Sequence, residues 1–389
     1  MSRKICVITG SRAEYGLLRP VMAAIQTSTA LSLQVVATGA HMAPAFGSTW
    51  HEIEENGFHI DCKVDMQLGE DTPVGIAASM GRGLIGIAGA LAELQPAVVL
   101  VLGDRYEIFV AVAAALMARI PVAHLHGGET TEGAFDEALR HAITKMSHLH
   151  FVAAAEYRDR VIQLGEQPAH VYLVGSPGLD DLASLPLPAR DALEKSLDFR
   201  FGRKNLLVTF HPVTLEPGAS ASQLAELLAA LDALQETNLV FTLPNADTEG
   251  SVLADMIRQF VATHANARCY ASLGRLRYLA CVRQVDGVIG NSSSGLIEVP
   301  GLHKGTVNIG DRQRGRLKAA SVIDCEPERA AITAAIARLY SPEFAALLPA
   351  VVNPYGDGGA AARIVQVLLE VPLTGLLKKT FYNVPIPRI

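Results

Sequence analysis

Short apolar runs alternate with longer amphipathic stretches along most of the chain. The runs in the first half are rich in β-branched residues and fall at 5–9, 33–38, 98–102, 121–125, 149–152 and 171–174. The second half repeats the alternation with runs at 206–210, 238–243, 287–289, 306–309 and 322–324. Strand-length runs separated by helix-length segments are typical of parallel sheets with crossover helices. The pattern therefore predicts an α/β protein with two doubly wound domains.

Chain length supports the same division. At 389 residues, half of them hydrophobic, the chain exceeds what one core usually supports. A polar stretch with two prolines, SLPLPARDAL, lies around residue 184 and is typical of an interdomain connection. We therefore expect one domain over residues 1–180 and a second over residues 181–365.

Composition narrows the classes of ligand. Thirty-three basic and thirty-nine acidic residues give a formal charge of −6, without the clustered basic surplus that nucleic-acid binding requires. The five cysteines are far apart and form no C-x-x-C pair, which indicates neither a disulfide framework nor a zinc cluster. Apolar runs such as 108–117 are too short to span a bilayer. We expect a soluble cytoplasmic protein that binds a small molecule, with no nucleic-acid or membrane partner.

Polar loops follow the predicted strands. They read GSRAEYG (10–16), GDRYE (103–107) and HGGE (126–129) in the first half, and HPVT (211–214), PNADTEG (244–250), GNSSSGLIE (290–298) and GDRQRGR (310–316) in the second. Any one of these loops could be polar only because turns favour such residues. Ligands of open parallel sheets bind at the carboxyl ends of the strands, where all of these loops lie. The pattern therefore predicts a binding site at those ends.

The segment GNSSSGLIE has the features of an anion site. It opens a predicted helix, whose N–H groups and positive dipole end favour a phosphate. It matches neither the P-loop nor G-x-G-x-x-G, and the first glycine of a serine-esterase elbow is replaced by Asn291. Asn291 or Ser292 could simply be a helix N-cap. Glu298 and Arg312 favour a nucleotide diphosphate instead, because a carboxylate can accept ribose hydroxyls while an arginine meets phosphate.

The stretch HLHGGETTEGAFDEALRHAITK concentrates acids and bases. His124 and His126 are two residues apart on a predicted strand, so they share a face and could form part of a metal site, although no third ligand is evident. For His124 a buried, backbone-bonded histidine is the simpler interpretation. A helical stripe of Phe135, Ala138, Leu139, Ala142, Ile143 and Met146 is expected to face the core, with Asp136 at its border and Glu137 pointing away. Arg140 and His141 would then pair with Asp136 and Glu137 at i+4.

These motifs together resemble the hydrolysing UDP-N-acetylglucosamine 2-epimerases, most of all the bacterial enzymes of sialic-acid biosynthesis. The resemblance rests on VITGSRAEYG, VLGDRYEIF, HLHGGE, DEALRHAITKMSHLH, FHPVT, NADT, IGNSSSGLIEVP and NIGDRQRGR, and runs from about residue 3 to beyond 355. It implies a GT-B-like fold with an interdomain active-site cleft and a C-terminal segment, 366–389, that packs back on the first domain. It also implies conversion of UDP-GlcNAc and water into N-acetylmannosamine and UDP without a cofactor or metal, in a homodimer or homotetramer.

The resemblance assigns roles to single residues. Arg12, His211, Arg312 and the loop Ser292, Ser293, Ser294, Gly295 are expected to attend the diphosphate, with Glu298 on the ribose. Arg105 and Asn245 lie in two of the matching motifs and are expected to bind the substrate. Asp104 and Asp136 match family carboxylates implicated in catalysis, and Glu137 adjoins the second. A like charge about 4 Å from a carboxylate would destabilise it by about 4 kcal/mol, which corresponds to about three pKa units. Such a difference would make one carboxyl an acid and its neighbour a base.

One position departs from part of the family. Some members carry a glutamate at the position of His126, whereas here the next acid is Glu129. Either His126 transfers the proton, for which an ordinary histidine pKa is suitable, or Glu129 reaches in; we favour His126. A related epimerase acting on UDP-N,N′-diacetylbacillosamine, a GT-B glycosyltransferase and a non-catalytic sugar-nucleotide sensor are the alternatives.

Overall fold

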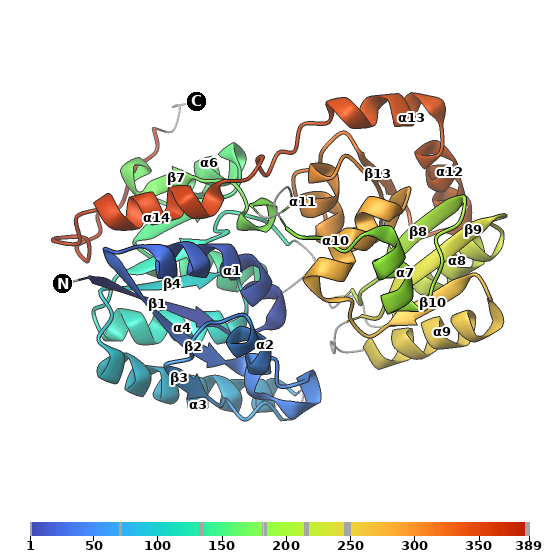
Figure 1. The fold of residues 1–389 in the computed structure, drawn as a ribbon. Coiled ribbons are helices and arrows are strands. Elements are labelled where there is room, and N and C mark those ends of the chain that lie inside the picture. The colour runs from blue at the N-terminus through green and yellow to red at the C-terminus, as the bar shows by residue number, and fades with distance from the viewer. Residues whose placement is uncertain are drawn as a thin grey trace. The chain divides into compact units, whose positions relative to one another are not determined.

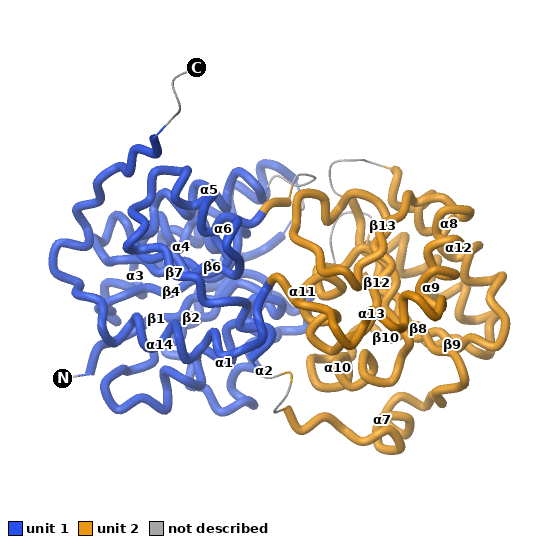
Figure 2. Tube along the Cα trace, turned by 90° about the horizontal axis from the view of Figure 1, so that it is seen from above, with its two compact units in different colours: residues 1–129, 135–180, 355–389 blue, residues 130–134, 181–354 orange. Residues whose placement is uncertain are grey.

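The computed structural model describes residues 2–69, 72–131, 136–180, 182, 185–213, 218–244 and 250–385. The chain divides into two compact units (Figure 2). Unit 1 comprises residues 1–129, 135–180 and 355–389, and unit 2 comprises residues 130–134 and 181–354. The chain therefore returns to unit 1 at its C-terminal end. The domain limits expected from the sequence remain a prediction.

Unit 1 is built on a seven-stranded sheet of order β3-β2-β1-β4-β5-β6-β7, in which every pairing is parallel (Figure 1). Its strands are β1 Arg3–Thr9, β2 Leu31–Thr38, β3 Cys62–Val64, β4 Val98–Leu102, β5 Val122–Leu125, β6 Leu149–Val152 and β7 Val171–Leu173. Its helices are α1 Arg12–Thr27, α2 Trp50–Glu55, α3 Pro73–Leu94, α4 Tyr106–Met117, α5 Asp136–Met146, α6 Ala155–Gln163 and α14 Ala360–Glu370.

Unit 2 repeats the architecture with a six-stranded parallel sheet of order β10-β9-β8-β11-β12-β13. Its strands are β8 Lys204–Thr209, β9 Thr237–Thr242, β10 Ala267–Tyr270, β11 Gly287–Gly290, β12 Gly305–Ile309 and β13 Val322–Cys325. Its helices are α7 Arg190–Leu197, α8 Ala219–Asp232, α9 Gly250–Thr263, α10 Gly274–Gln284, α11 Ser294–Gly301, α12 Arg329–Leu339 and α13 Pro342–Leu347. Two Rossmann-like α/β domains are thus confirmed.

The cores lie on both faces of each sheet because successive strand residues point to opposite sides. In β1, Ile5 and Val7 enter one buried cluster while Cys6 and Ile8 enter the cluster on the other face. Strands buried on both sides read as continuous apolar runs, which is how the sequence shows them. Helix α14 adds Ala361, Ile364 and Leu368 to the first of these clusters, so the C-terminal segment completes the core of unit 1.

Helix α3 is the long apolar element that the sequence reading missed. By length and composition Pro73–Leu94 could cross a membrane, and a bent pair formed by 329–339 and 342–350 passes the same test as one segment. Ile87, Ala90 and Leu91 of α3 are buried in the core of unit 1. Only 28% of the most apolar part of α3 is buried, so most of this helix presents apolar side chains at the surface.

Candidate active site

Each sheet has one switch point, where the strand order reverses, and polar loops follow the strands on both sides of it. In unit 1 the order reverses between β1 and β4, and Gly10 and Gly103 follow the ends of these strands. In unit 2 it reverses between β8 and β11, which are followed by His211 and Asn291. Helices on the two sides of a switch point diverge and leave room for a ligand at the carboxyl edge. The loops selected from the sequence therefore stand where such folds bind their ligands.

His126 and Glu129 form a buried pair after β5. His126 Nδ1 lies 2.5 Å from Glu129 Oε1, and the two side chains are 8% and 4% exposed. The other ring nitrogen, Nε2, is buried and meets no hydrogen-bond partner among the described residues. The sequence left His126 and Glu129 as alternatives, whereas the structure joins them. The carboxylate holds the imidazole, and the hydrogen-bonding capacity of Nε2 is unused among the described residues.

The backbone of this turn depends on glycine. His126 itself has a left-handed φ of 63°, so it lies outside β5 and does not share a strand face with His124, contrary to the prediction. At Gly128 the φ is +79° and a Cβ would lie 2.3 Å from the Tyr157 carbonyl oxygen. No other residue fits there without moving α6. This tight turn brings Glu129 back toward His126.

His124 fits the simpler interpretation given above. Its Nε2 pairs with the Gly103 carbonyl at 2.8 Å, and its Nδ1 lies 3.3 Å from the Thr144 hydroxyl. Burial lowers the pKa of His124 to about 3, so the ring is neutral. Within the described ranges no three of His, Cys, Asp and Glu gather in a way that could hold a metal.

A buried arginine joins two of the candidate carboxylates. Arg140 on α5 is 2% exposed; its Nη2 donates to Asp104 Oδ2, and its Nη1 donates to Glu137 Oε2 at 3.0 Å. The same Nη1 donates to the Glu129 carbonyl at 2.9 Å. The sequence argument took the neighbouring charge at these acids to be of like sign, but the structure places a cation between Asp104 and Glu137. One guanidinium is therefore the partner of both acids.

Helix α5 is turned differently from the predicted stripe. Its buried residues are Arg140, Ile143 and Thr144, while Ala138 is exposed. Phe135, the first residue of the predicted stripe, lies outside the described residues. The predicted Glu137–His141 pair is present at 3.0 Å, but Glu137 also holds Arg140 and does not point away from the protein. The predicted stripe is confirmed for Ile143 and Met146, which pack in the core, but it is wrong at Ala138. Periodicity assigns the interior to apolar residues, whereas here a paired guanidinium also occupies it. Asp136 opens the helix and is half-buried.

A second acidic cluster lies behind the loop that follows β1. Arg105 donates from Nε to Oε2 of the fully buried Glu107 at 3.2 Å, and Arg12 pairs with Glu52 at 3.1 Å. Burial, followed by the charge of Glu107, raises the pKa of Glu14 to about 8. The side chains of Arg12 and Arg105 are 39% and 40% exposed, so neither is enclosed by the protein. Glu14 and Glu107 were not among the predicted residues, although both belong to loops singled out there.

In unit 2, Asn291 locks the two central strands together. Its Oδ1 accepts from the backbone N–H of His211 at 2.7 Å, and its Nδ2 donates to the His211 carbonyl at 2.8 Å. The preceding Gly290 has a φ of +138°, and a Cβ there would lie 1.9 Å from the Thr209 carbonyl oxygen. The N-cap position of α11 belongs to Ser293, so Asn291 and Ser292 are not the helix cap. Asn291 instead positions the loop.

Several of the predicted diphosphate residues gather at this loop. Arg312 Nη1 donates to the Asn291 carbonyl at 3.0 Å. Burial, followed by the charge of Arg312, lowers the pKa of His211 to about 3, so His211 is neutral and can serve as a hydrogen-bond donor but not as a cation. Ser292, Ser293 and Ser294 are half-buried at the start of α11, and Gly295 packs against Thr306.

Glu298 lies one turn further along α11 and is half-buried. Tyr278 of α10, which the sequence reading did not select, lies near Ser294 and Glu298, and burial raises its pKa. Asn245 falls outside the described residues.

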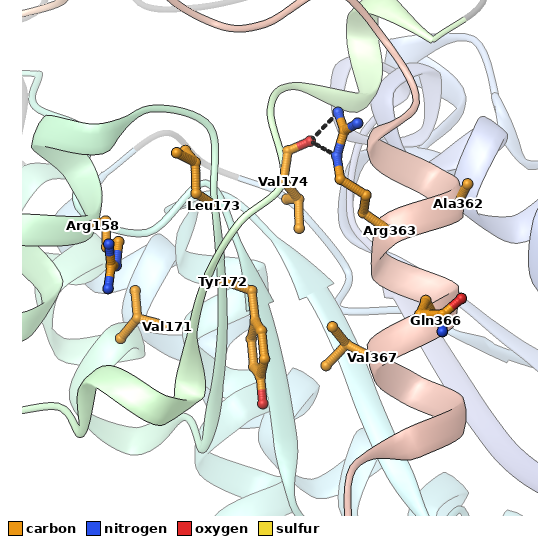
Figure 3. Close-up of a pocket in the computed structure, with 9 residues that line it drawn as sticks. All are labelled: Arg158, Val171, Tyr172, Leu173, Val174, Ala362, Arg363, Gln366 and Val367. Carbon is orange, nitrogen blue, oxygen red and sulfur yellow. Dashed lines mark hydrogen bonds between the residues drawn. The ribbon is translucent and has the colours of Figure 1, made fainter.

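A separate pocket of about 580 Å³ lies in unit 1 between the edge strand β7 and α14 (Figure 3). It is lined by Arg158, Val171, Tyr172, Leu173, Val174, Ala362, Arg363, Gln366 and Val367. None of the candidate active-site residues lines it. Arg363 is already engaged with the Val174 carbonyl at 2.7 Å and 2.9 Å.

Comparison with known proteins agrees with this geometry. The family described as UDP-N-acetylglucosamine 2-epimerase matches residues 23–369. The GDP/UDP-N,N′-diacetylbacillosamine 2-epimerase (hydrolyzing) of Campylobacter jejuni is 38% identical and covers 88% of both chains. Polysialic acid biosynthesis protein P7 of Escherichia coli is 38% identical and covers 98% of both chains.

A solved structure supports the fold. The UDP-GlcNAc 2-epimerase from Neisseria meningitidis, crystallised with UDP-GlcNAc, has a TM-score of 0.82 at 18% identity and covers 95% of this chain and 100% of its own. This likeness shows the GT-B-like fold. Together with the family match and the two relatives, it shows that the chain belongs to the UDP-N-acetylglucosamine 2-epimerase family, a family of enzymes.

Proposed function

We propose that the chain is a hydrolysing 2-epimerase that converts UDP-N-acetylglucosamine and water into N-acetylmannosamine and UDP for sialic-acid biosynthesis. The observation that carries the proposal is the buried His126–Glu129 pair, which shares the carboxyl edge of one sheet with the Asp104–Arg140–Glu137 network. This arrangement offers a positioned acid and a stabilised carboxylate within one unit. The relative named for polysialic acid biosynthesis supports the pathway.

The chemistry requires two steps. The hydrogen on C2 of the sugar is hardly acidic, so its removal must accompany loss of UDP from C1. A base takes the C2 proton while the C1–O bond breaks, its electron pair leaves with UDP, and a double bond forms between C1 and C2. Water then adds its oxygen to C1 of this 2-acetamidoglucal, and C2 receives a proton on the opposite face. General acid and base groups each contribute about 10²- to 10⁴-fold to such transfers.

The groups of unit 1 suit the proton transfers. Asp104 is paired with Arg140 and is our candidate for the base, with Asp136 as the other matching carboxylate. His126 is our candidate for the acid of the second step, because Glu129 fixes the orientation of its ring and its Nε2 makes no hydrogen bond to the described residues. Glu137 then acts through Arg140 and His141 as a positioning residue.

The groups of unit 2 suit the departing UDP. Backbone N–H groups at the start of α11, the hydroxyls of Ser292, Ser293 and Ser294, and the backbone at Gly295 would hold the diphosphate. Arg312 adds a positive charge, His211 a neutral donor, and Glu298 accepts the ribose hydroxyls. Arg12 and Arg105 of unit 1 are further candidates for the leaving group. Because protein groups supply every role, the proposed reaction uses no metal or nicotinamide.

A second substrate is favoured by one specific observation. The Campylobacter jejuni relative, as similar as the polysialic-acid relative, is named for UDP-N,N′-diacetylbacillosamine. We therefore keep this sugar as the alternative substrate for the same chemistry. The test compares kcat/KM for the two UDP-sugars, with free UDP measured by chromatography and no acceptor present. At least tenfold preference for UDP-N-acetylglucosamine is expected. The reverse preference would show that UDP-N,N′-diacetylbacillosamine is the substrate. If neither UDP-sugar released UDP, a transferase or a sensor would be favoured.

We further propose that the enzyme works in the cytoplasm as a homodimer or homotetramer. Association between copies of the chain is a property that can be measured separately from turnover.

A further inference from the structure

The chain beyond α14 forms an irregular strap, residues 376–385 (Figure 1). It belongs to unit 1 and passes the turn that follows α6. Two hydrogen bonds fasten it there: Gln167 Nε2 donates to the Thr380 hydroxyl at 2.9 Å, and the Tyr382 N–H donates to the Gly165 carbonyl at 2.8 Å. The strap therefore follows a defined path, although its described residues form no regular secondary structure.

The turn after α6 fits Phe381 of the strap. Gly165 has a left-handed φ of +90°, and a Cβ there would lie 2.3 Å from Phe381 Cε2. Glycine is therefore required both by the backbone and by the ring. The Lys145 ammonium of α5 lies 5.0 Å from the centre of the same ring, which is a cation–π distance. The strap thus contacts α5 as well as the end of α6.

Lys379 is the polar centre of the strap, and its side chain is 26% exposed. An ammonium has three N–H donors. Lys379 Nζ has three acceptors, which are Glu166 Oε2 at 2.7 Å, the Lys145 carbonyl at 2.8 Å and the Ser147 carbonyl at 2.5 Å. The two carbonyls lie at the C-terminal end of α5, where the last C=O groups lack helical partners and the helix dipole favours a cation. Lys379 therefore caps α5 from a position 234 residues beyond Lys145 in the sequence.

Glu166 joins the strap to the sheet and to α5. Its side chain is 3% exposed, and besides Lys379 it accepts from His150 Nε2 of β6 at 2.9 Å and from Lys145 Nζ at 2.6 Å. Burial alone would raise the pKa of Glu166, but the hydrogen bonds from these three partners lower it to about 2. Glu166 is therefore a buried carboxylate, and a buried charge depends on its partners staying in place. The strap, β6 and α5 thus share one buried anion.

Helix α5 also carries candidate catalytic groups. Arg140 holds Asp104 and Glu137, and Asp136 opens the helix. Arg140 lies five residues before Lys145, which is about 7.5 Å along the helix axis at about 1.5 Å per residue. A helix moves as one body over such a distance, so a shift at its C-terminal end displaces the guanidinium. Misplacement of reacting groups by about 1 Å can lower a rate about 100-fold.

We propose that Lys379 is a positioning residue for the reaction: it fixes the C-terminal end of α5 and thereby sets the place of Arg140 and the two carboxylates that Arg140 holds. This role rests on the proposed function, because that function gives the carboxylates their part in catalysis. The described contacts of Lys379 are with Glu166 and the end of α5. Its effect on turnover therefore passes through that helix.

Steady-state kinetics of Lys379→Met test the role. The substitution keeps an unbranched side chain and removes the three donors, so kcat should fall about 10- to 100-fold. KM and the Kd for UDP should stay close to the wild-type values, because most of the proposed diphosphate groups lie in unit 2. The adjacent, exposed Lys378 provides the matched control, and Lys378→Met should retain the wild-type kcat. A normal kcat in Lys379→Met would overturn the proposal.

The same assay separates this role from the proposed function. A wild type that releases no UDP would contradict the proposed function, and the role of Lys379 would fall with it. An active wild type with an equally active Lys379→Met would contradict only the role of Lys379.

Hydrogen exchange followed by mass spectrometry shows where the substitution acts. In Lys379→Met, the amides of α5 should exchange faster than in the wild type, while those of α8 in unit 2 should be unchanged. A fall in kcat without faster exchange in α5 would overturn the proposal, because the effect would then not pass through α5.

Lys379→Arg is the second variant and decides the question if Lys379→Met does not fold. A planar guanidinium keeps the charge but cannot place its donors on the three acceptors as an ammonium does. The kcat should therefore fall several-fold, while KM and the far-UV circular dichroism spectrum stay as in the wild type. An unchanged kcat in Lys379→Arg, together with an unfolded Lys379→Met, would show that Lys379 serves the fold alone.

Discussion

Glu129 Oε1 lies 2.5 Å from His126 Nδ1, and both side chains are almost fully buried. A carboxylate in this position fixes the orientation and the tautomer of the ring. Glu129→Gln should therefore keep the hydrogen bond but lower kcat about 10- to 100-fold, since the charge is lost.

His126→Asn is the matched variant and should lower kcat more than Glu129→Gln does, by about 10³-fold. If Glu129→Gln were as inactive as His126→Asn, Glu129 would be the proton donor and His126 its support.

Arg140 balances the charges of two carboxylates inside unit 1, so its removal should lower the stability of the protein. Arg140→Met is expected to lower the free energy of unfolding by about 3–5 kcal/mol, because Asp104 and Glu137 would both lose the guanidinium, although Glu137 would keep His141. Urea unfolding measures this loss. The double variant Arg140→Met/Glu137→Gln should be more stable than Arg140→Met alone, but it should not regain activity. If the two substitutions lowered the free energy of unfolding additively, Arg140 and Glu137 would not be coupled.

Glu298 is expected to act on the nucleotide and not on the chemistry. Glu298→Ala should raise the Kd for UDP about 10- to 100-fold, since hydrogen bonds to a charged group contribute about 1.5–3 kcal/mol. Asp104→Asn is the control for the opposite behaviour, with turnover lost and UDP affinity nearly unchanged. Calorimetric titration of both variants with UDP separates the two roles, and an unaltered Kd for Glu298→Ala would refute the ribose contact.

Glu14 links folding stability to pH. Its pKa is raised to about 8 by burial and by Glu107, so between about pH 4.5 and pH 8 the folded protein holds a proton that the unfolded chain releases. The stabilisation from this group is complete below pH 4.5 and is lost as the pH rises toward 8, at no more than about 1.4 kcal/mol per pH unit. Glu14→Gln should remove this slope, so its stability relative to the wild type should increase from pH 5.5 to 8.5.

The exposed Glu55 of α2 offers the matched control for that measurement. Glu55→Gln should leave the pH dependence of urea unfolding as it is in the wild type. A Glu14→Gln variant that kept the wild-type slope would mean that another group carries it.

The fold was predictable because its strands are buried on two faces. Nearly all strands expected from apolar runs are present within one or two residues of their observed limits. The missed strands, Cys62–Val64 and Ala267–Tyr270, are short edge strands that carry a basic residue each. Helix α3 was also missed, since its apolar residues extend around the helix and give no clear stripe.

The site was predictable at the level of loops but not of pairings. Strand ends placed Asp104, His126, His211 and the Ser292–Gly295 loop at the carboxyl edges, as the structure confirms. Arg140 was treated as a surface partner of Asp136, because helical periodicity cannot show that a guanidinium is buried between acids. The left-handed turn at His126 depends on Gly128 packing against Tyr157, a contact between residues far apart in the sequence that no local pattern contains.

The central claim is elimination of UDP followed by hydration, and proton NMR of the reaction in heavy water tests it most directly. With UDP-N-acetylglucosamine as substrate, free UDP should appear together with N-acetylmannosamine that carries deuterium at C2, because the second proton comes from solvent. N-acetylmannosamine that retained its original hydrogen at C2, or UDP-sugar left intact, would contradict the account.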